Sequence, residues 1–251
     1  MRFTDKKVIV TGSAGAIGGA IASAFAREGA KLGLVDLKSS PLFQDRSGRH
    51  VEAIADLTDL PSLRNAITTA ALHLGGVDIL VNAAGVTSFG AAAELSEDEW
   101  DRVLSINLKS VFFACQAVMP LLKAAGGGGR IVNIGSLLGK NGGNARPWID
   151  PTEQTGSGNV AYGVSKAGVH AMTIFLAKEL AAAGVTVNAV APGPIVSAMT
   201  SKFPDRLRAL LPVARMGQPT EVSAAVLFLA SAEAAFITGE VLDVNGGAWC
   251  D

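Results

Sequence analysis

The sequence predicts an α/β domain in which helices cover both faces of a doubly wound parallel sheet. Short β-branched runs alternate with longer segments of helical spacing along the chain. Strands that are apolar at nearly every position are buried on both faces, as in a parallel sheet. No linker, repeat or low-complexity tract divides the 251 residues. We therefore expect one domain, 1–251, in three layers.

The strands are predicted by apolar, β-branched runs that are bounded by turn residues or charges. They are expected at 8–10, 32–35, 51–55, 77–81, 131–134, 185–190 and 240–244. Right-handed crossovers between parallel strands then give the doubly wound order.

Glycines end most of the predicted helices, because a helix commonly ends on a residue with positive φ. Ser96 and Glu99 form a capping-box pattern at the start of the third helix. The helices are expected at 17–28, 60–74, about 97–125, 159–183 and 219–229. Two stretches rich in Gly and Pro, 139–158 and 192–212, are predicted to be irregular.

The composition excludes several classes of partner. The chain has 21 basic and 22 acidic residues and no basic block, so neither a nucleic acid nor an anionic membrane is expected. No apolar run is long enough to span a bilayer, and the N-terminus has no signal-peptide pattern. Cys115 and Cys250 lie far apart without metal-ligand spacing, so we expect no metal and a reducing, cytoplasmic location.

A glycine-rich turn follows the first strand and points to a nucleotide phosphate. Gly12, Gly15 and Gly18 precede a helix, and such a turn directs backbone amides and the positive end of the helix at an anion. Asp36 ends the second strand about 20 residues later, where a carboxylate accepts hydrogen bonds from the adenosine ribose and repels a 2′-phosphate. Lys38 nearby would soften this exclusion of NADP. The pattern favours NAD, with a ligand-free turn and a solvated acid as the alternative.

A phenol and an ammonium are placed one helical turn apart near the fifth strand. Tyr162 is the only tyrosine of the chain, and Lys166 follows it by four residues, so both lie on one helix face. A cation beside a phenol favours the phenolate and lowers its pKa, so Tyr162 is expected to exchange a proton with an alcohol. Ser136 follows the fifth strand at the carboxyl edge of the sheet, where ligands bind in such folds.

These segments resemble motifs of the classical short-chain dehydrogenase/reductase family. The segment 11–18, TGSAGAIG, resembles the cofactor turn T-G-x-x-x-G-x-G, with Ala16 in place of the middle glycine. The segment 82–85, NAAG, resembles the motif N-N-A-G, and Tyr162 with Lys166 matches Y-x-x-x-K. The resemblance covers nearly the whole chain and implies a Rossmann-like fold and an NAD-dependent enzyme acting on CH–OH groups.

The resemblance also implies roles for individual residues. The catalytic residues are expected to be Ser136, Tyr162, Lys166 and Asn107, with Ser136 stabilising the reacting oxygen and Asn107 holding a water beside Lys166. The cofactor is expected to contact Gly12, Ala14, Gly15, Ile17, Gly18, Asp36, Leu37, Asp56, Leu57, Asn82, Ala83, Gly85, Tyr162, Lys166, Pro192, Gly193, Ile195 and Ser197. For Asn82, a purely structural role remains an equal alternative.

The segment between Ser136 and Tyr162 is longer than is usual in the family, and it predicts a substrate loop at about 139–158. Within it, Arg146 is suited to clamp a carboxylate and Trp148 to stack on a sugar face. We therefore expect a small polar substrate, a keto-deoxy sugar acid or a polyol, bound by Ser136, Arg146, Trp148 and Tyr162. The alternative is a loop that pairs internally or contacts a neighbouring subunit.

A lid is expected at about 197–215.

Other functions stay open at this stage. A 3-oxoacyl or general ketone reductase is the first alternative, although Asp36 opposes the NADPH that such enzymes often use. A non-catalytic NAD sensor is a second alternative, which the intact set of Ser136, Tyr162 and Lys166 opposes.

Charged residues make up only 17% of the chain, which favours self-association, and the family resemblance implies a homotetramer.

Overall fold

The computed structural model describes residues 1–40, 48–142, 159–201, 203 and 205–250. Within these residues the chain forms a seven-stranded sheet, in which all paired strands are parallel and the order is β3-β2-β1-β4-β5-β6-β7. The strands are β1 (Lys7–Thr11), β2 (Lys31–Asp36), β3 (His50–Ile54), β4 (Ile79–Asn82), β5 (Arg130–Ile134), β6 (Thr186–Pro192) and β7 (Val241–Val244). The chain direction across the sheet reverses between β1 and β4, and the carboxyl ends of the strands at such a point are where ligands bind in sheets of this kind.

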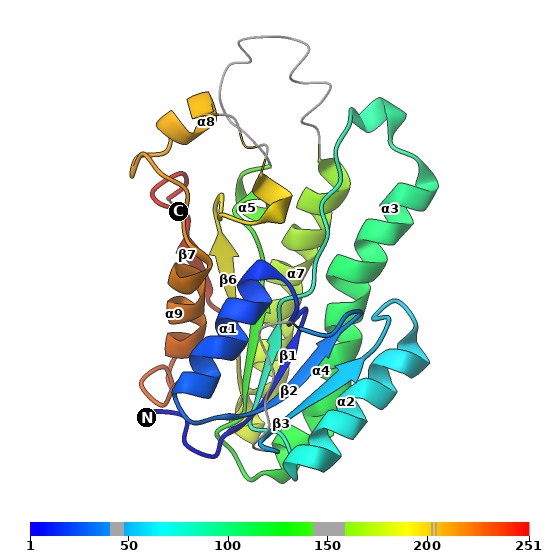
Figure 1. The fold of residues 1–251 in the computed structure, drawn as a ribbon, viewed down its shortest axis with the longest axis vertical. Helices are drawn as coiled ribbons and strands as arrows, with labels where there is room; N and C mark the ends of the chain where they lie inside the picture. Colours follow the sequence, from blue (N-terminus) through cyan, green and yellow to red (C-terminus); the bar gives the residue numbers. More distant parts are fainter. Residues whose placement is uncertain (41–47, 143–158, 202, 204, 251) are drawn as a thin grey trace.

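Helices cover both faces of this sheet (Figure 1). The apolar sides of α1 (Ala16–Arg27) and α9 (Pro219–Ala230) share one core cluster, which includes Phe25 and Val226. The helices α2 (Leu60–Leu74), α4 (Ser110–Ala124) and α7 (Val160–Leu180) share the cluster on the other face. The prediction of a Rossmann-like fold in three layers is confirmed.

The strands form because their apolar side chains fill both cores. Every residue of β5 and of β6 is buried, as the continuous apolar pattern of a central parallel strand requires. The observed strand and helix bounds agree with the predicted ones to within one or two residues at nearly every end, which is the ordinary disagreement at element ends.

One predicted helix, at about 97–125, changes its hydrogen-bond register part of the way along. It begins as α3 (Glu97–Leu104), widens into a π-helical turn at Ser105–Lys109, labelled η2, and continues as α4. At its start the Ser96 side chain accepts from the Glu99 backbone N–H, but the Glu99 carboxylate binds Arg102. Only one half of the expected capping box is therefore seen.

The predicted irregular stretches contain short helices. Residues Leu138–Asn141 form α5, so the expectation of a loop from 139 is wrong for its first residues, and the rest of that loop, with Arg146 and Trp148, lies outside the described residues. In the predicted lid, Ala198–Thr200 form the 3-10 helix η4 and Asp205–Ala209 form α8. A four-residue helix has too few turns to show a periodic pattern.

Two helical stretches, Glu97–Ala124 and Val160–Ala183, reach the length and apolar character of a membrane span, contrary to the expectation that no segment does. Both lie against the sheet and contribute Val118, Leu122, Val169 and Leu180 to its core. A helix buried inside an α/β domain is apolar for this reason, and the length test does not separate the two cases.

Candidate active site

Ser136 lies in the turn that follows β5, at the carboxyl edge of the sheet. The turn is tied to β6, because Gly135 N–H donates to Val190 O at 2.8 Å and Leu137 N–H donates to Pro192 O at 2.9 Å. The side chain of Ser136 accepts from Leu138 N–H at 3.2 Å. Its hydroxyl is thereby held in a buried position, with its proton available to a neighbour.

That neighbour is Tyr162, in the first turn of α7. A hydrogen bond from Ser136 reaches the phenol oxygen and favours its ionised form. Lys166 follows one turn later, and its Nζ lies 5.8 Å from the centroid of the Tyr162 ring. The structure therefore brings Ser136, Tyr162 and Lys166 together at one edge of the sheet, as the sequence predicts.

The electrostatics of Tyr162 differ from the prediction. Burial raises the pKa of Tyr162 above its usual value, and the hydrogen bond from Ser136 offsets this only in part. The expectation that Lys166 lowers this pKa is wrong for the protein by itself. Burial also lowers the pKa of Lys166 to about 8, because the charged form of a buried amine loses hydration.

Lys166 is positioned by the end of β5. Its Nζ donates to Ile134 O at 2.7 Å. A Cβ placed on Gly85 would lie 3.4 Å from this Nζ and 3.4 Å from Asn107 Oδ1. Gly85 thus lies beside Lys166 and Asn107, and a side chain there would be in van der Waals contact with both.

Asn107 lies in the π-helical turn and is fully buried. Its amide binds both backbone groups of Val86, accepting from N–H and donating to O at 2.8 Å each. It also donates to Ser165 Oγ at 3.0 Å, and that hydroxyl donates to Tyr162 O. Single π turns often occur at functional sites. Here the turn lets one amide connect the segment after β4 with the helix of Tyr162.

The glycine turn after β1 has the shape expected of a phosphate cradle. Gly12 has a φ of 71°, and a Cβ there would lie 2.5 Å from Ala84 N, so any side chain would collide with the segment after β4. A Cβ on Gly18 would overlap Gly12 O. Gly15 is the N-cap of α1 and makes no side-chain cap hydrogen bond. The amides of Gly12 and Gly15 donate to Val35 O and Gly12 O. The anion site is therefore the first turn of α1 with its positive helix end, and a dinucleotide pyrophosphate fits it.

The carboxylate of Asp36 is fixed at the end of β2. One oxygen accepts from Ala14 N–H at 2.9 Å and the other from Lys38 N–H at 3.2 Å. It thus joins the glycine turn to the second strand, and the neighbouring Leu37 is exposed.

Asp56 follows β3, the strand next to β2. Thr58 donates to Asp56 from both its backbone and its hydroxyl, and these bonds lower the pKa of Asp56. Leu57 is buried beneath.

The side chain of Asn82 forms its hydrogen bonds inside the protein, with the neighbouring strands and α4. Its amide donates to Asn133 Oδ1 at 2.9 Å and to Cys115 Sγ at 3.3 Å, and its side-chain oxygen faces Thr11. Asn133 in turn donates to Thr173 of α7. With its side chain fully engaged, Asn82 can affect a cofactor only by fixing the backbone that leads through Ala83 to Gly85.

The segment after β6 is held in place by hydrogen bonds of its backbone to neighbouring segments. Gly193 N–H donates to Val244 O, and a Cβ on Gly193 would lie 2.9 Å from Asn245 Cα. Thr200 Oγ1 donates to Ile195 O at 2.6 Å and accepts from Ser197 N–H at 3.0 Å. Pro192 ends β6, and Ile195 is buried.

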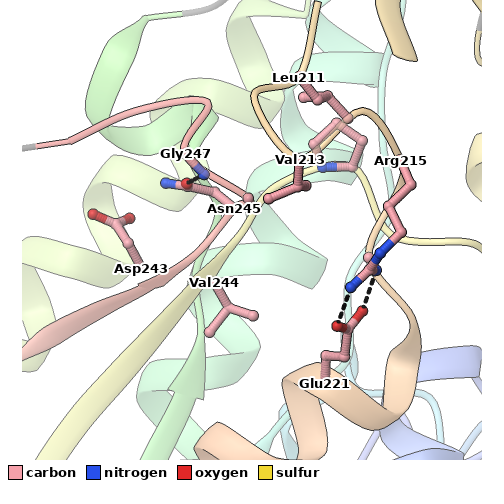
Figure 2. A pocket seen from close by; sticks show the side chains of 11 residues that line it. Leu211, Val213, Arg215, Glu221, Asp243, Val244, Asn245 and Gly247 are labelled. Atoms are coloured by element: carbon pink, nitrogen blue, oxygen red, sulfur yellow. Dashed lines mark hydrogen bonds and ion pairs between the residues drawn. The ribbon is translucent and has the colours of Figure 1, made fainter. Parts of the chain in front are cut away.

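A cavity of about 280 Å³ lies next to this segment, between the predicted lid and the end of β7. Figure 2 shows Val213 and Asn245 on its wall and Arg215 bound through two hydrogen bonds to Glu221 of α9. None of the predicted site residues that the structure describes lines it. It is therefore separate from the cluster around Tyr162.

One further residue of this site, His170, was not predicted. It lies one turn beyond Lys166 on the same face of α7, and its Nε2 accepts from Ser136 N–H at 3.3 Å. The spacing Tyr162, Lys166, His170 was the signal that could have identified it.

Comparison with known proteins agrees with this geometry. A family model described as Enoyl-(Acyl carrier protein) reductase matches residues 12–248. The chain is 35% identical to the 3-oxoacyl-[acyl-carrier-protein] reductase FabG of Thermotoga maritima, over 98% of this chain and 99% of that protein. It is 38% identical to the D-threitol dehydrogenase of Mycolicibacterium smegmatis, over 98% and 94% respectively.

A solved structure, a blue fluorescent protein from a metagenomic library in complex with NADPH, superimposes with a TM-score of 0.88. It is 33% identical, and the match covers 100% of both chains. Together with the order of the motifs and the arrangement of Ser136, Tyr162 and Lys166, these similarities show that the chain belongs to the short-chain dehydrogenase/reductase family.

Proposed function

We propose that this member of the family interconverts a secondary alcohol and a ketone with NAD as its cofactor, on a small polar substrate such as a sugar acid or a polyol. The observation that carries the reaction type is the hydrogen bond from Ser136 to Tyr162 beside Lys166. The choice of NAD is supported by Asp36, whose carboxylate is held at the end of β2 by two backbone amides.

In this proposal the residues of the chain hold the substrate oxygen and move its proton. The nicotinamide ring, when bound, accepts hydride from the alcohol carbon or returns it to the ketone. Tyr162 takes the hydroxyl proton, and Ser136 donates a hydrogen bond to the oxygen as negative charge develops on it. Lys166 binds the nicotinamide ribose, and the positive charges near Tyr162 then offset the effect of burial on its pKa. The proton leaves through Lys166 and a water held beside Asn107.

The cofactor is proposed to lie across the carboxyl ends of β1, β2 and β4. The first-turn amides of α1, which follow the turn of Gly12 and Gly15, bind the pyrophosphate. Asp36 binds the adenosine ribose, and the segment 192–197 faces the carboxamide. Steady-state kinetics with NADH and NADPH test this assignment. A higher kcat/KM with NADPH than with NADH would refute the preference for NAD.

The substrate class is tested by a panel. It contains D-threitol, ribitol, a 2-keto-3-deoxy sugar acid and acetoacetyl-CoA, assayed in both directions. Turnover of the sugar acid or of a polyol supports the proposal. A second candidate, a 3-oxoacyl reductase, is favoured by the relative from Thermotoga maritima, and a clear preference for acetoacetyl-CoA would establish it instead.

We also propose that the protein is a homotetramer in the cytoplasm. Apolar side chains on α4 and α7 face solvent in the single chain, among them Phe112, Ile174 and Phe175, the last 76% exposed. Burying such exposed apolar side chains between subunits drives self-association. Light scattering coupled to size-exclusion chromatography tests the assembly, and a monomer at micromolar concentration would refute it.

A further inference from the structure

His170 occupies an unusual place for an ionisable residue. It is 8% exposed, and it lies beneath the turn that carries Ser136. Its Nε2 accepts from the backbone N–H of Ser136, so this nitrogen carries no proton, and the ring is neutral with its proton on Nδ1.

The turn is shaped around this ring. A Cβ on Gly135 would collide with Nε2, and a Cβ on Gly139 would lie 2.9 Å from Cε1. Gly135 therefore admits the imidazole, and the N–H of Ser136 donates to Nε2. Gly139 admits the backbone of α7, since a Cβ there would lie 2.7 Å from Ala167 N, nearer than the ring. Apart from the contact with His170, the turn is joined to β6 by the backbone hydrogen bonds of Gly135 and Leu137, the residues on either side of Ser136.

The surroundings keep the imidazole neutral. Burial lowers the pKa of His170 to about 4, and the cations of Lys140 and Lys166 add to this effect. Lys140 is itself held by Asp243, 2.9 Å away, and by Val241 O. The acceptor on Nε2 is consequently present over the whole neutral range.

We propose that His170 is a positioning residue for the reaction: it accepts the Ser136 N–H and so fixes the peptide rotation that directs the Ser136 hydroxyl at Tyr162. The inference rests on the proposed roles of Ser136 and Tyr162. His170 itself touches neither substrate nor cofactor in this assignment.

The test compares two substitutions of similar size. His170→Gln keeps an acceptor oxygen near the position of Nε2, whereas His170→Leu fills the space without one. We expect Leu to lower kcat for the fastest compound of the panel at least about tenfold, as the loss of one oriented hydrogen bond in a transition state does. The Kd for NADH should stay within about twofold, and Gln should restore most of kcat.

The Ser136→Ala background separates positioning from packing. Because the Ser136 hydroxyl is already absent there, adding His170→Leu should reduce kcat by less than about twofold. Equal losses in both backgrounds, or full activity of His170→Leu, would overturn the inference. If the Leu variant does not fold, as judged by circular dichroism, His170→Asn replaces it, since its amide oxygen ends short of Nε2.

A second readout needs no substrate. The single tyrosine gives an unobstructed ultraviolet titration of the Tyr162 phenol, followed with NAD⁺ bound. We expect Ser136→Ala and His170→Leu to raise this pKa together and His170→Gln to leave it unchanged. A rise with Ser136→Ala alone overturns the role of His170 and leaves the proposed function intact. No rise with Ser136→Ala refutes the coupling of Ser136 to Tyr162, and with it both proposals.

Discussion

Asn107 and Val86 are joined by two hydrogen bonds of 2.8 Å, one in each direction. Because both groups of the Val86 backbone are satisfied by one buried side chain, the segment that follows β4 cannot shift without breaking this pair. The same amide reaches Ser165, so the helix that carries Tyr162 and the segment after β4 are held in one arrangement.

Asn107→Ala should therefore weaken both stability and turnover. It leaves the N–H and the carbonyl of Val86 without a partner, so we expect the free energy of unfolding to fall by about 2–4 kcal/mol. Urea denaturation measures this loss. Ser165→Ala is the control, since it removes only the link to α7 and should cost about 1 kcal/mol. Equal stabilities of the Asn107 variant and the wild type would contradict the role of this amide.

Tyr162→Phe removes the proton donor and acceptor while it keeps the ring. We expect kcat to fall by about 10³-fold, within the range for loss of a general acid or base. NADH binding, measured by fluorescence titration, should be unchanged, because the ring still fills its place at the start of α7. Retained turnover would exclude Tyr162 as the catalytic residue.

The charge of Asp36 should control the choice of cofactor. In Asp36→Asn the side chain keeps its shape but no longer repels a 2′-phosphate, so kcat/KM with NADPH should rise about tenfold. The value with NADH should fall by a similar factor, because charge-assisted hydrogen bonds to the ribose are lost. Asp5→Asn, at an exposed acid before β1 and thus at the opposite end of the sheet, is the matched control. An unchanged ratio of NADH to NADPH in Asp36→Asn would show that another residue selects the cofactor.

His170 should make the protein sensitive to acid. Its pKa is about 4 in the folded chain against 6.5 ordinarily, so between these values the unfolded chain binds more protons than the folded one. This contribution to stability is complete above about pH 6.5 and is lost as the pH falls toward 4. Against His170→Gln, the wild type should lose up to about 3 kcal/mol over this window. Chemical denaturation at pH 7 and pH 4.5 measures the difference, and parallel curves for the two proteins would contradict the burial of a neutral imidazole.

Much of the fold was predictable because its signals are local. The apolar strands, the glycines that end helices and the turn at Gly12 each follow from a few neighbouring residues. Tyr162 and Lys166 share a helix face, so their proximity also followed from spacing alone. Ser136 could be placed because the carboxyl end of a parallel strand is where such a sheet binds ligands.

What the sequence could not give depends on contacts between distant segments. The π turn at Asn107 is a change of hydrogen-bond register that leaves the apolar pattern of the helix intact. The pKa of Tyr162 is raised, opposite to the expectation, because the effect of burial outweighs the hydrogen bond from Ser136, and burial is set by the whole fold. Helical spacing places His170 on the face of Tyr162 and Lys166, but its contact with Ser136 joins residues 34 positions apart and depends on how α7 packs against the turn after β5.

The widened turn at Ser105–Lys109 also limits how this chain can change in length. Deleting one residue there would restore a regular helix and rotate everything before or after it by about 100°, which would swing the amide of Asn107 away from Val86. In contrast, an added Cβ at any of the glycines 126–128 would meet nothing within 4 Å. Among relatives, insertions and deletions should therefore accumulate at the glycines 126–128, after α4, and be absent from the π turn at Ser105–Lys109, before α4.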